Sequence, residues 1–145
     1  SRSMAGARLG YALAPAALIA DLEKIKYSVN PYNVNRLTLR LGEATVDAED
    51  YYQEKCAAIV APRQRTAEAL KALGFTVLPS QTNFLFAKID KIGGRELYEK
   101  LKDRGILVRH FGNPRISDFV RITIGTDAQM DACLDAIRCI LEECV

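Results

Sequence analysis

Apolar and polar positions follow a helical period near the start of the chain. Leu18, Ile19, Leu22 and Ile25 lie one, three and three residues apart, with charged residues between them. Side chains at these spacings share one face of a helix. The pattern therefore predicts a helix that begins after Pro15.

A second helix is expected in the next segment. Residues 30–33, Asn-Pro-Tyr-Asn, end the first helix, because the residue before a proline avoids helical dihedrals and asparagine favours turns. Asn33 or Asn35 can then cap a new helix. This helix should run to about Leu41, where Gly42 suits the left-handed position that closes many helices.

A long helical stretch is predicted from residue 47 to residue 73, closed by Gly74. Pro62 lies inside it. A proline in a helix interior costs roughly 3 kcal/mol, because it lacks an amide donor and collides with the preceding turn. We therefore expect either a kink at Pro62 or a join between two helices.

The period changes to that of β-structure after residue 74. Short runs rich in β-branched and aromatic residues, separated by turn formers, predict four strands: 75–78, 83–89, 106–111 and 119–124. A helix is expected between Gly94 and Gly105, and another after Thr126, whose spacing to Gln129 matches a capping box. The order strand, strand, helix, strand, strand, helix indicates a two-layer α/β unit with helices on one face of a small sheet.

The cysteines indicate packing rather than chemistry. Cys56, Cys133, Cys139 and Cys144 form no closely spaced pair, and His110 is the only histidine of the sequence. A closed zinc site needs four such ligands at short paired spacings, so we expect no metal site. Cys133 and Cys144 fall on the apolar stripe of the last predicted helix and are expected to fill the core, as reduced thiols.

Composition is that of an ordinary globular protein. The 145 residues are 49% hydrophobic and 26% charged, which argues against disorder. Lys plus Arg number 20 and Asp plus Glu 18, so the net charge of +2 lacks the basic excess of a nucleic-acid-binding protein. No apolar run approaches the ~20 residues that cross a bilayer, so we expect no membrane partner and a cytoplasmic location.

Three arginines are candidates for binding an anion, and Arg8 is the first. It lies between Gly6 and Gly10, and glycines let the backbone come close to a ligand. A guanidinium there can hold a phosphate through two parallel hydrogen bonds. A surface arginine beside a tight turn would give the same pattern.

Arg109 and Arg121 fall in neighbouring predicted strands. Alternation places Arg121 on the face opposite Val120 and Ile122. An unpaired buried charge is costly, so this arginine needs water or an anion beside it. The two arginines can form a two-cation pocket for a dianion, or each can lie on a solvated face. His110 points away from Arg109 and is interpreted as a structural residue rather than a general base.

The opening segment, S-R-S-M-A-G-A-R-L-G-Y over residues 1–11, resembles the stretch just after the cofactor lysine of fold-type I pyridoxal-phosphate aminotransferases. In that family a serine-lysine pair precedes an A-G-x-R-x-G-Y motif, whose arginine binds the cofactor phosphate. Arg8 occupies the place of that arginine. The lysine's place falls just before Ser1, so we expect a C-terminal fragment that contains no catalytic residue.

The chain is also similar to one subfamily, the histidinol-phosphate aminotransferases, at four segments: P-Y-N-V-N at 31–35, Q-T-N-F-L at 81–85, G-I-L-V-R at 105–109 and V-R-I-T-I-G-T at 120–126. The resemblance covers essentially the whole chain. It implies the C-terminal small domain of a fold-type I enzyme at residues 47–145, preceded by the end of the large cofactor-binding domain and a linker at residues 1–46.

The resemblance further implies an activity for the parent enzyme. It would move an amino group between L-histidinol phosphate and 2-oxoglutarate, with pyridoxal 5'-phosphate as carrier, as a homodimer. Arg8 would hold the cofactor phosphate. Arg121 and Arg109 would bind the substrate phosphate or a glutamate carboxylate, and Tyr32 and Asn33 would lie near the active site or the dimer contact. Without the lysine, the fragment is expected to be inactive and to lose the cofactor.

Two other interpretations stay open. The same strand and helix order occurs in free-standing regulatory modules that bind small molecules, in which paired arginines would hold a carboxylate. A related aminotransferase for aromatic or aspartate-type substrates would also use Arg121. The fragment-like start argues against the first, and Arg109 with the 31–35 segment favours the histidinol-phosphate enzyme. Residues 1–41 are expected to expose apolar surface, since their packing partners would be absent.

Overall fold

The computed structural model describes residues 2–144. Ser1 and Val145 lie outside the described residues. Ser1 begins both the first expected domain and the aminotransferase-like opening segment, and Val145 ends the second expected domain. The chain forms two compact units, Ser1–Cys56 and Ala57–Val145. The expected domain boundary after residue 46 stays a prediction.

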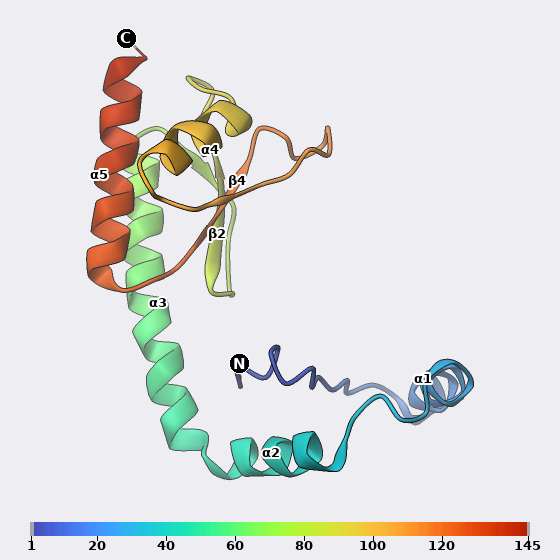
Figure 1. Cartoon of the computed structure of the whole chain (residues 1–145). Helices are drawn as coiled ribbons and strands as arrows, with labels where there is room; N and C mark the ends of the chain where they lie inside the picture. Colours follow the sequence, from blue (N-terminus) through green and yellow to red (C-terminus); the bar gives the residue numbers. More distant parts are fainter. Residues whose placement is uncertain (1, 145) are drawn as a thin grey trace. The chain divides into compact units, whose positions relative to one another are not determined.

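The first unit is helical. It contains α1 (Ala16–Val29), α2 (Arg36–Asp47) and the start of α3 (Glu49–Ala72), which follow one another from blue to green in Figure 1. Asn35 begins α2, because its side chain accepts a hydrogen bond from the backbone N–H of Thr38 at 2.8 Å. Of the two asparagines expected to cap this helix, Asn35 is therefore the cap.

One expectation about these helices is wrong, and another is only partly decided. Helix α2 does not end near Leu41 but continues through Gly42 to Asp47. A Cβ at Gly42 would lie 2.6 Å from the side chain of Leu9, so the glycine permits a close approach instead of closing the helix. Helix α3 runs through Pro62 as one element, so the join expected there is absent, and the alternative, a kink, stays a prediction. Pro62 is buried, and burial of its ring offsets part of the lost hydrogen bond.

The apolar exposure expected of the early segment is confirmed for the residues that the structure describes. Helix α1 has no buried residue. Leu13 is 89% exposed, Val29 79% and Leu37 73%. These side chains contribute little to a core, although their apolar area would favour burial.

The second unit is built on an antiparallel sheet with the order β1-β2-β4-β3, whose strands are β1 (Thr76–Val77), β2 (Phe84–Lys88), β3 (Arg109–His110) and β4 (Val120–Thr123). All four predicted strands exist but are shorter than predicted. The third is shortest relative to its pattern, because the N–H of Ile106 donates to the carbonyl of Leu101 and closes the preceding helix instead of joining the sheet.

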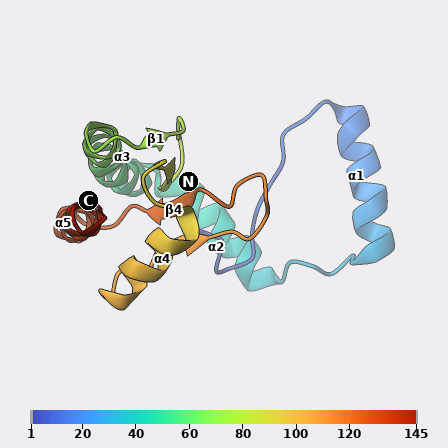
Figure 2. The same ribbon diagram turned by 90° about the horizontal axis from the view of Figure 1, so that it is seen from above.

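Three helices cover one face of this sheet, in agreement with the two-layer prediction. They are α3, α4 (Gly94–Asp103) and α5 (Asp127–Glu143), and Figures 1 and 2 show α3 and α5 side by side. The sheet residues facing them and the helix residues facing the sheet form one buried cluster, which includes Leu70, Leu85, Leu97, Leu101, Val120, Ile122, Cys133 and Ile137. Cys144 is half-buried against this cluster, so the expected packing of both cysteines is confirmed.

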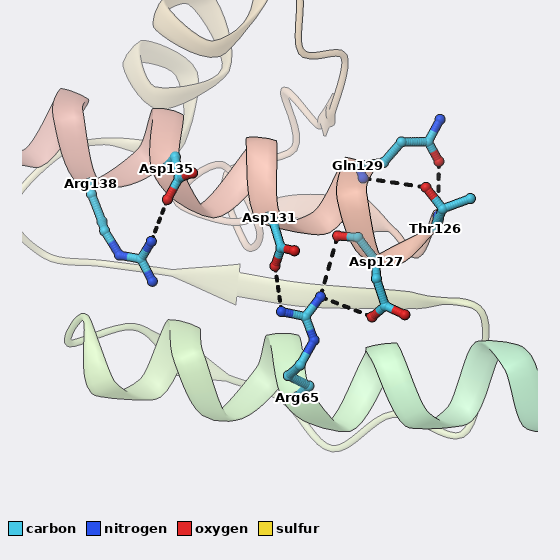
Figure 3. A network of polar contacts seen from close by, with 7 residues as sticks. All are labelled: Arg65, Thr126, Asp127, Gln129, Asp131, Asp135 and Arg138. Carbon is cyan, nitrogen blue, oxygen red and sulfur yellow. Dashed lines mark hydrogen bonds and ion pairs between the residues drawn. The ribbon is translucent and has the colours of Figure 1, made fainter.

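Polar contacts fix the start of α5. The capping box is present as predicted: Thr126 and Gln129 exchange hydrogen bonds between side chain and backbone. Arg65 of α3 donates from Nη2 to a carboxylate oxygen of Asp127 at 3.0 Å and from Nη1 to Asp131 (Figure 3). Since α5 directly follows β4, these contacts also fix the chain where the last strand ends.

Candidate anion-binding site

Two arginines lie side by side on the sheet face that the helices leave uncovered. Arg109 of β3 and Arg121 of β4 are direct partners in the antiparallel register. Residues paired in this way project to the same face of a sheet. Val120 and Ile122, the neighbours of Arg121, are 0% and 2% exposed on the core side, so the predicted alternation is confirmed.

Phenyl rings surround these arginines. The Arg121 guanidinium carbon, Cζ, lies 5.3 Å from the ring centroid of Phe84 and 5.8 Å from that of Phe111. The Cζ atom of Arg109 lies 5.6 Å from the ring of Phe111 as well. These distances are within the range of cation–π attraction. Phe111 is thus shared by the two cations.

The charges of the two arginines are not neutralised by carboxylates of the described residues. Among residues 2–144, neither Arg109 nor Arg121 forms an ion pair, and Nε of Arg121 is buried without a hydrogen-bond partner. A third cation, Lys88 of β2, lies over the ring of Phe119 at 5.8 Å. Its ammonium group is 3.5 Å from the carboxylate of Asp90. Two unpaired guanidinium groups beside each other are suited to a phosphate or a carboxylate.

Arg8 belongs to the first unit, in a tight turn. Its backbone has a φ of 58°, in the left-handed region, and its N–H donates to the carbonyl of Ala5 at 3.1 Å. Its side chain is exposed and forms no ion pair within the described part of the chain. A Cβ at Gly6 or Gly10 would meet no atom within 4 Å. The guanidinium group of Arg8 is therefore accessible from solvent.

Tyr32 and Asn33, the other two predicted site residues, also belong to the first unit. Tyr32 is 92% exposed, and Asn33 is exposed in the turn before α2. Their predicted nearness to an active site or a dimer contact stays a prediction.

His110 forms a hydrogen bond with a backbone carbonyl group. Its Nε2 atom lies 2.8 Å from the carbonyl oxygen of Ser117, across the loop that joins β3 to β4. This contact agrees with its interpretation as a structural residue. Within residues 2–144 no cluster of three or more His, Cys, Asp or Glu side chains could hold a metal ion. Nor does this part of the chain contain a helix with the length and apolarity that crossing a membrane requires.

The sequence interpretation identified the arginines but missed Phe84 and Phe111. Alternation alone places Phe111 on the face of Arg109 and Phe84 on the outer face of its own strand. Their approach to Arg121 depends on the register between strands, which pairs Phe86 of β2 with Arg121. A search for aromatic residues two positions from each arginine would have found Phe111.

Comparison with known proteins agrees with this architecture. Residues 1–137 match the family model described as aminotransferase class I and II. The chain belongs to this family of enzymes.

Its relatives include the histidinol-phosphate aminotransferases. That of Chromohalobacter salexigens is 42% identical over 140 residues, 97% of this chain and 40% of the relative. That of Marinomonas sp. is 46% identical over 140 residues, 95% of this chain and 40% of the relative. The structure of the Sinorhizobium meliloti histidinol-phosphate aminotransferase in complex with pyridoxal-5'-phosphate superimposes with a TM-score of 0.78 and 28% identity, over 98% of this chain and 39% of that one. The chain thus spans about 40% of the length of the curated relatives it matches.

Proposed function

We propose that this chain is the anion-recognising part of an aminotransferase that moves an amino group between L-histidinol phosphate and 2-oxoglutarate in histidine biosynthesis. The observation that carries the proposal is the direct pairing of Arg109 with Arg121 on an uncovered sheet face, without counter-ions among the described residues. The names and identities of the relatives support this choice of substrates.

One pocket can serve both half-reactions because both substrates carry an anion at a similar place. A guanidinium binds a phosphate or a carboxylate through the same pair of parallel N–H donors. Arg121 and Arg109 would receive the phosphate of L-histidinol phosphate in one half-reaction and a carboxylate of glutamate in the other. Both substrates would then bind to the same two unpaired guanidinium groups.

The cofactor of the parent enzyme would be pyridoxal 5'-phosphate, with its phosphate on Arg8. This cofactor supplies the electron sink and carries the amino group between the two substrates. The exposed guanidinium of Arg8 and the open space beside Gly6 and Gly10 are compatible with a bound phosphate. By analogy with the family motif, the lysine that anchors the cofactor is not in the present sequence, so we propose that the 145-residue chain alone neither retains the cofactor nor transaminates.

The same proposal extends to the domain organisation and the subunits of the parent enzyme. Residues 1–46 would be the end of the large cofactor-binding domain and its linker, and residues 47–145 the small domain. The parent would be a homodimer, with Tyr32 and Asn33 near the active site or the subunit contact. The exposed apolar side chains of the first unit, including Leu13 and Leu37, are consistent with further protein covering them.

Anion binding by the chain itself provides the test. Titration with inorganic phosphate and with L-histidinol phosphate, followed by NMR, should shift the side-chain resonances of both arginines. Arg121→Gln and Arg109→Gln should each weaken binding of L-histidinol phosphate about 10-fold or more, as expected for loss of a charge-assisted bidentate contact. Arg95→Gln is the matched control, because Arg95 is an exposed arginine of α4 whose side chain is 80% accessible.

Two results would contradict the proposal. Equal weakening by Arg95→Gln would mean that net charge rather than a site binds the anion. Tighter binding of L-aspartate or L-tyrosine than of L-histidinol phosphate would favour the other aminotransferase classes. Treatment with pyridoxal 5'-phosphate and borohydride should give no stoichiometric single-site adduct by mass spectrometry, since the anchoring lysine is absent.

A further inference from the structure

We infer that Phe84 and Phe111 are positioning residues, which hold the guanidinium group of Arg121 in a fixed orientation for an anion. The inference rests on the proposed function, because it assigns a task to residues beside the proposed substrate arginine. The two rings come from different elements: Phe84 from β2 and Phe111 from the segment just after β3. Both lie within 6 Å of the same Cζ atom, at 5.3 Å and 5.8 Å.

Within the described part of the chain, no oxygen atom accepts a hydrogen bond from Arg121. No carboxylate of residues 2–144 pairs with it, and its buried Nε–H has no acceptor. A buried donor without a partner costs about 1–3 kcal/mol, so another interaction must favour this conformation. The electron-rich faces of the two rings are the attraction that the structure offers, and cation–π attraction of this kind amounts to about 0.5–2 kcal/mol.

Ring faces hold a guanidinium without using its donors. An ion pair would occupy the N–H groups that a phosphate or a carboxylate needs, whereas a phenyl ring contacts the flat face of the cation and leaves the N–H groups at its edge available. A ring therefore reduces the freedom of a flexible side chain before the ligand arrives, which lowers the entropic cost of binding.

Phe111 is itself held by further rings. Its ring meets that of Phe86 edge-on, with centroids 6.0 Å apart and planes at 76°. Phe86 stacks on Phe119 at 4.7 Å and 16°. This row joins β2, the residue just before β4 and the segment after β3, so Phe111 is held by rings from outside its own loop. Because Phe111 also lies 5.6 Å from Cζ of Arg109, its removal should affect both arginines.

The first test uses the unmodified chain. The Hε resonances of Arg121 and Arg109, identified by their disappearance in the Arg→Lys variants, should be displaced by the ring currents of the neighbouring phenyl groups. The Hε resonance of Arg95, which is exposed on α4, provides the reference. If the Arg121 resonance coincides with that reference, the positioning role is wrong.

The second test compares variants that keep an apolar side chain but remove the ring. Phe84→Leu should displace the Arg121 resonance alone, and Phe111→Leu should displace those of both arginines. Each should weaken binding of inorganic phosphate about 3- to 10-fold. Phe84→Tyr and Phe111→Tyr keep the ring face and should bind within about twofold of the unmodified chain. Phe75→Leu is the matched control, because Phe75 belongs to the core of the second unit and no guanidinium lies over its ring among the described residues.

The possible failures are distinguishable. If the unmodified chain binds phosphate through Arg121, but Phe84→Leu and Phe111→Leu bind it as well as Phe75→Leu does, the positioning role is overturned and the proposed function stands. If the unmodified chain does not bind phosphate or L-histidinol phosphate through Arg121, the proposed function fails, and the Hε resonances still report whether the rings hold the guanidinium. Thermal unfolding of each variant identifies any loss that comes from unfolding.

Discussion

Cys133 shows how the environment of a single side chain follows from its place in the sequence pattern. It lies on the apolar stripe of α5 and is 3% exposed in the core of the second unit. Burial disfavours the charged thiolate, and this raises the pKa of Cys133 from 9.0 to about 11. The thiol is therefore neutral at physiological pH and behaves as a small apolar side chain.

The stability of the folded chain should therefore decrease at alkaline pH. As pH rises, the Cys133 thiol of the unfolded chain ionises first, while that of the folded chain stays protonated. The contribution of this thiol to the free energy of unfolding is therefore complete below pH 9 and is lost as pH rises through about 11. The loss should approach about 2–3 kcal/mol at the upper end of this range. Urea unfolding at a series of pH values measures it, with Cys133→Ala as the reference that removes the titrating group. Parallel pH profiles for the two proteins would disprove the assignment.

Residues of the proposed site were predictable only in part. Alternation within one strand is a local property, so the orientation of Arg121 could be inferred from its neighbours Val120 and Ile122. The adjacency of Arg109 and Arg121 could be expected from strand order. The contacts of Phe84 and Phe111 with Arg121 could not, because they depend on the register between strands that are distant in the sequence.

Among the helices, one cation of α3 forms ion pairs with two carboxylates of α5. Arg65 pairs with Asp127 and Asp131, which lie on successive turns of α5 (Figure 3). Arg138 pairs instead with Asp135 of its own helix. The first arrangement links two elements, whereas the second stabilises a single helix.

Replacing Arg65 should therefore have a larger effect than replacing Arg138. Arg65→Met is expected to lower the free energy of unfolding, with a smaller loss at high salt, because exposed ion pairs are screened. Arg138→Met should cost about 0.3 kcal/mol, as is usual for a pair three residues apart on a helix. Hydrogen exchange should increase in the first turns of α5 in the Arg65 variant only. Equal effects of the two substitutions would show that the link between helices contributes nothing.

The ends of the helices could be predicted from the sequence where a local signal determines them. The helix ends at Gly74 and Gly105 have backbones in the left-handed region, with φ of 90° and 76°, as their positions predicted. The end expected at Gly42 was wrong, because the signal there is a tertiary contact with Leu9. Strand lengths were overestimated for a similar reason, since strand ends are determined by pairing partners.

For the whole molecule, the distribution of buried residues is unequal. Every residue of the hydrophobic core lies between Leu70 and Leu141, in the second unit. In the first unit, the buried side chains among the described residues are Thr38 and Thr45. Apolar burial is the main stabilising contribution to folding, so the second unit should be much the more stable of the two.

Limited proteolysis should reveal this difference. Under native conditions, cleavage is expected first within residues 2–56, and a fragment covering most of residues 57–144 should persist. Leu101→Ala, which removes a side chain with 0% exposure from the core, should cost about 2–5 kcal/mol and make the second unit susceptible as well. Mass spectrometry of the products identifies the sites. Resistance throughout residues 2–41 in a monodisperse monomer would contradict the expectation.

The pairing of Arg109 with Arg121 constrains how this protein can vary in evolution. The connection between the two strands can gain or lose residues without changing which side chains face each other, provided that the strands keep their phase. A shift of β4 by one residue would instead turn Arg121 toward the core and bring Val120 or Ile122 into water. Natural insertions and deletions should therefore gather between residues 112 and 118 and be absent from the strands on either side.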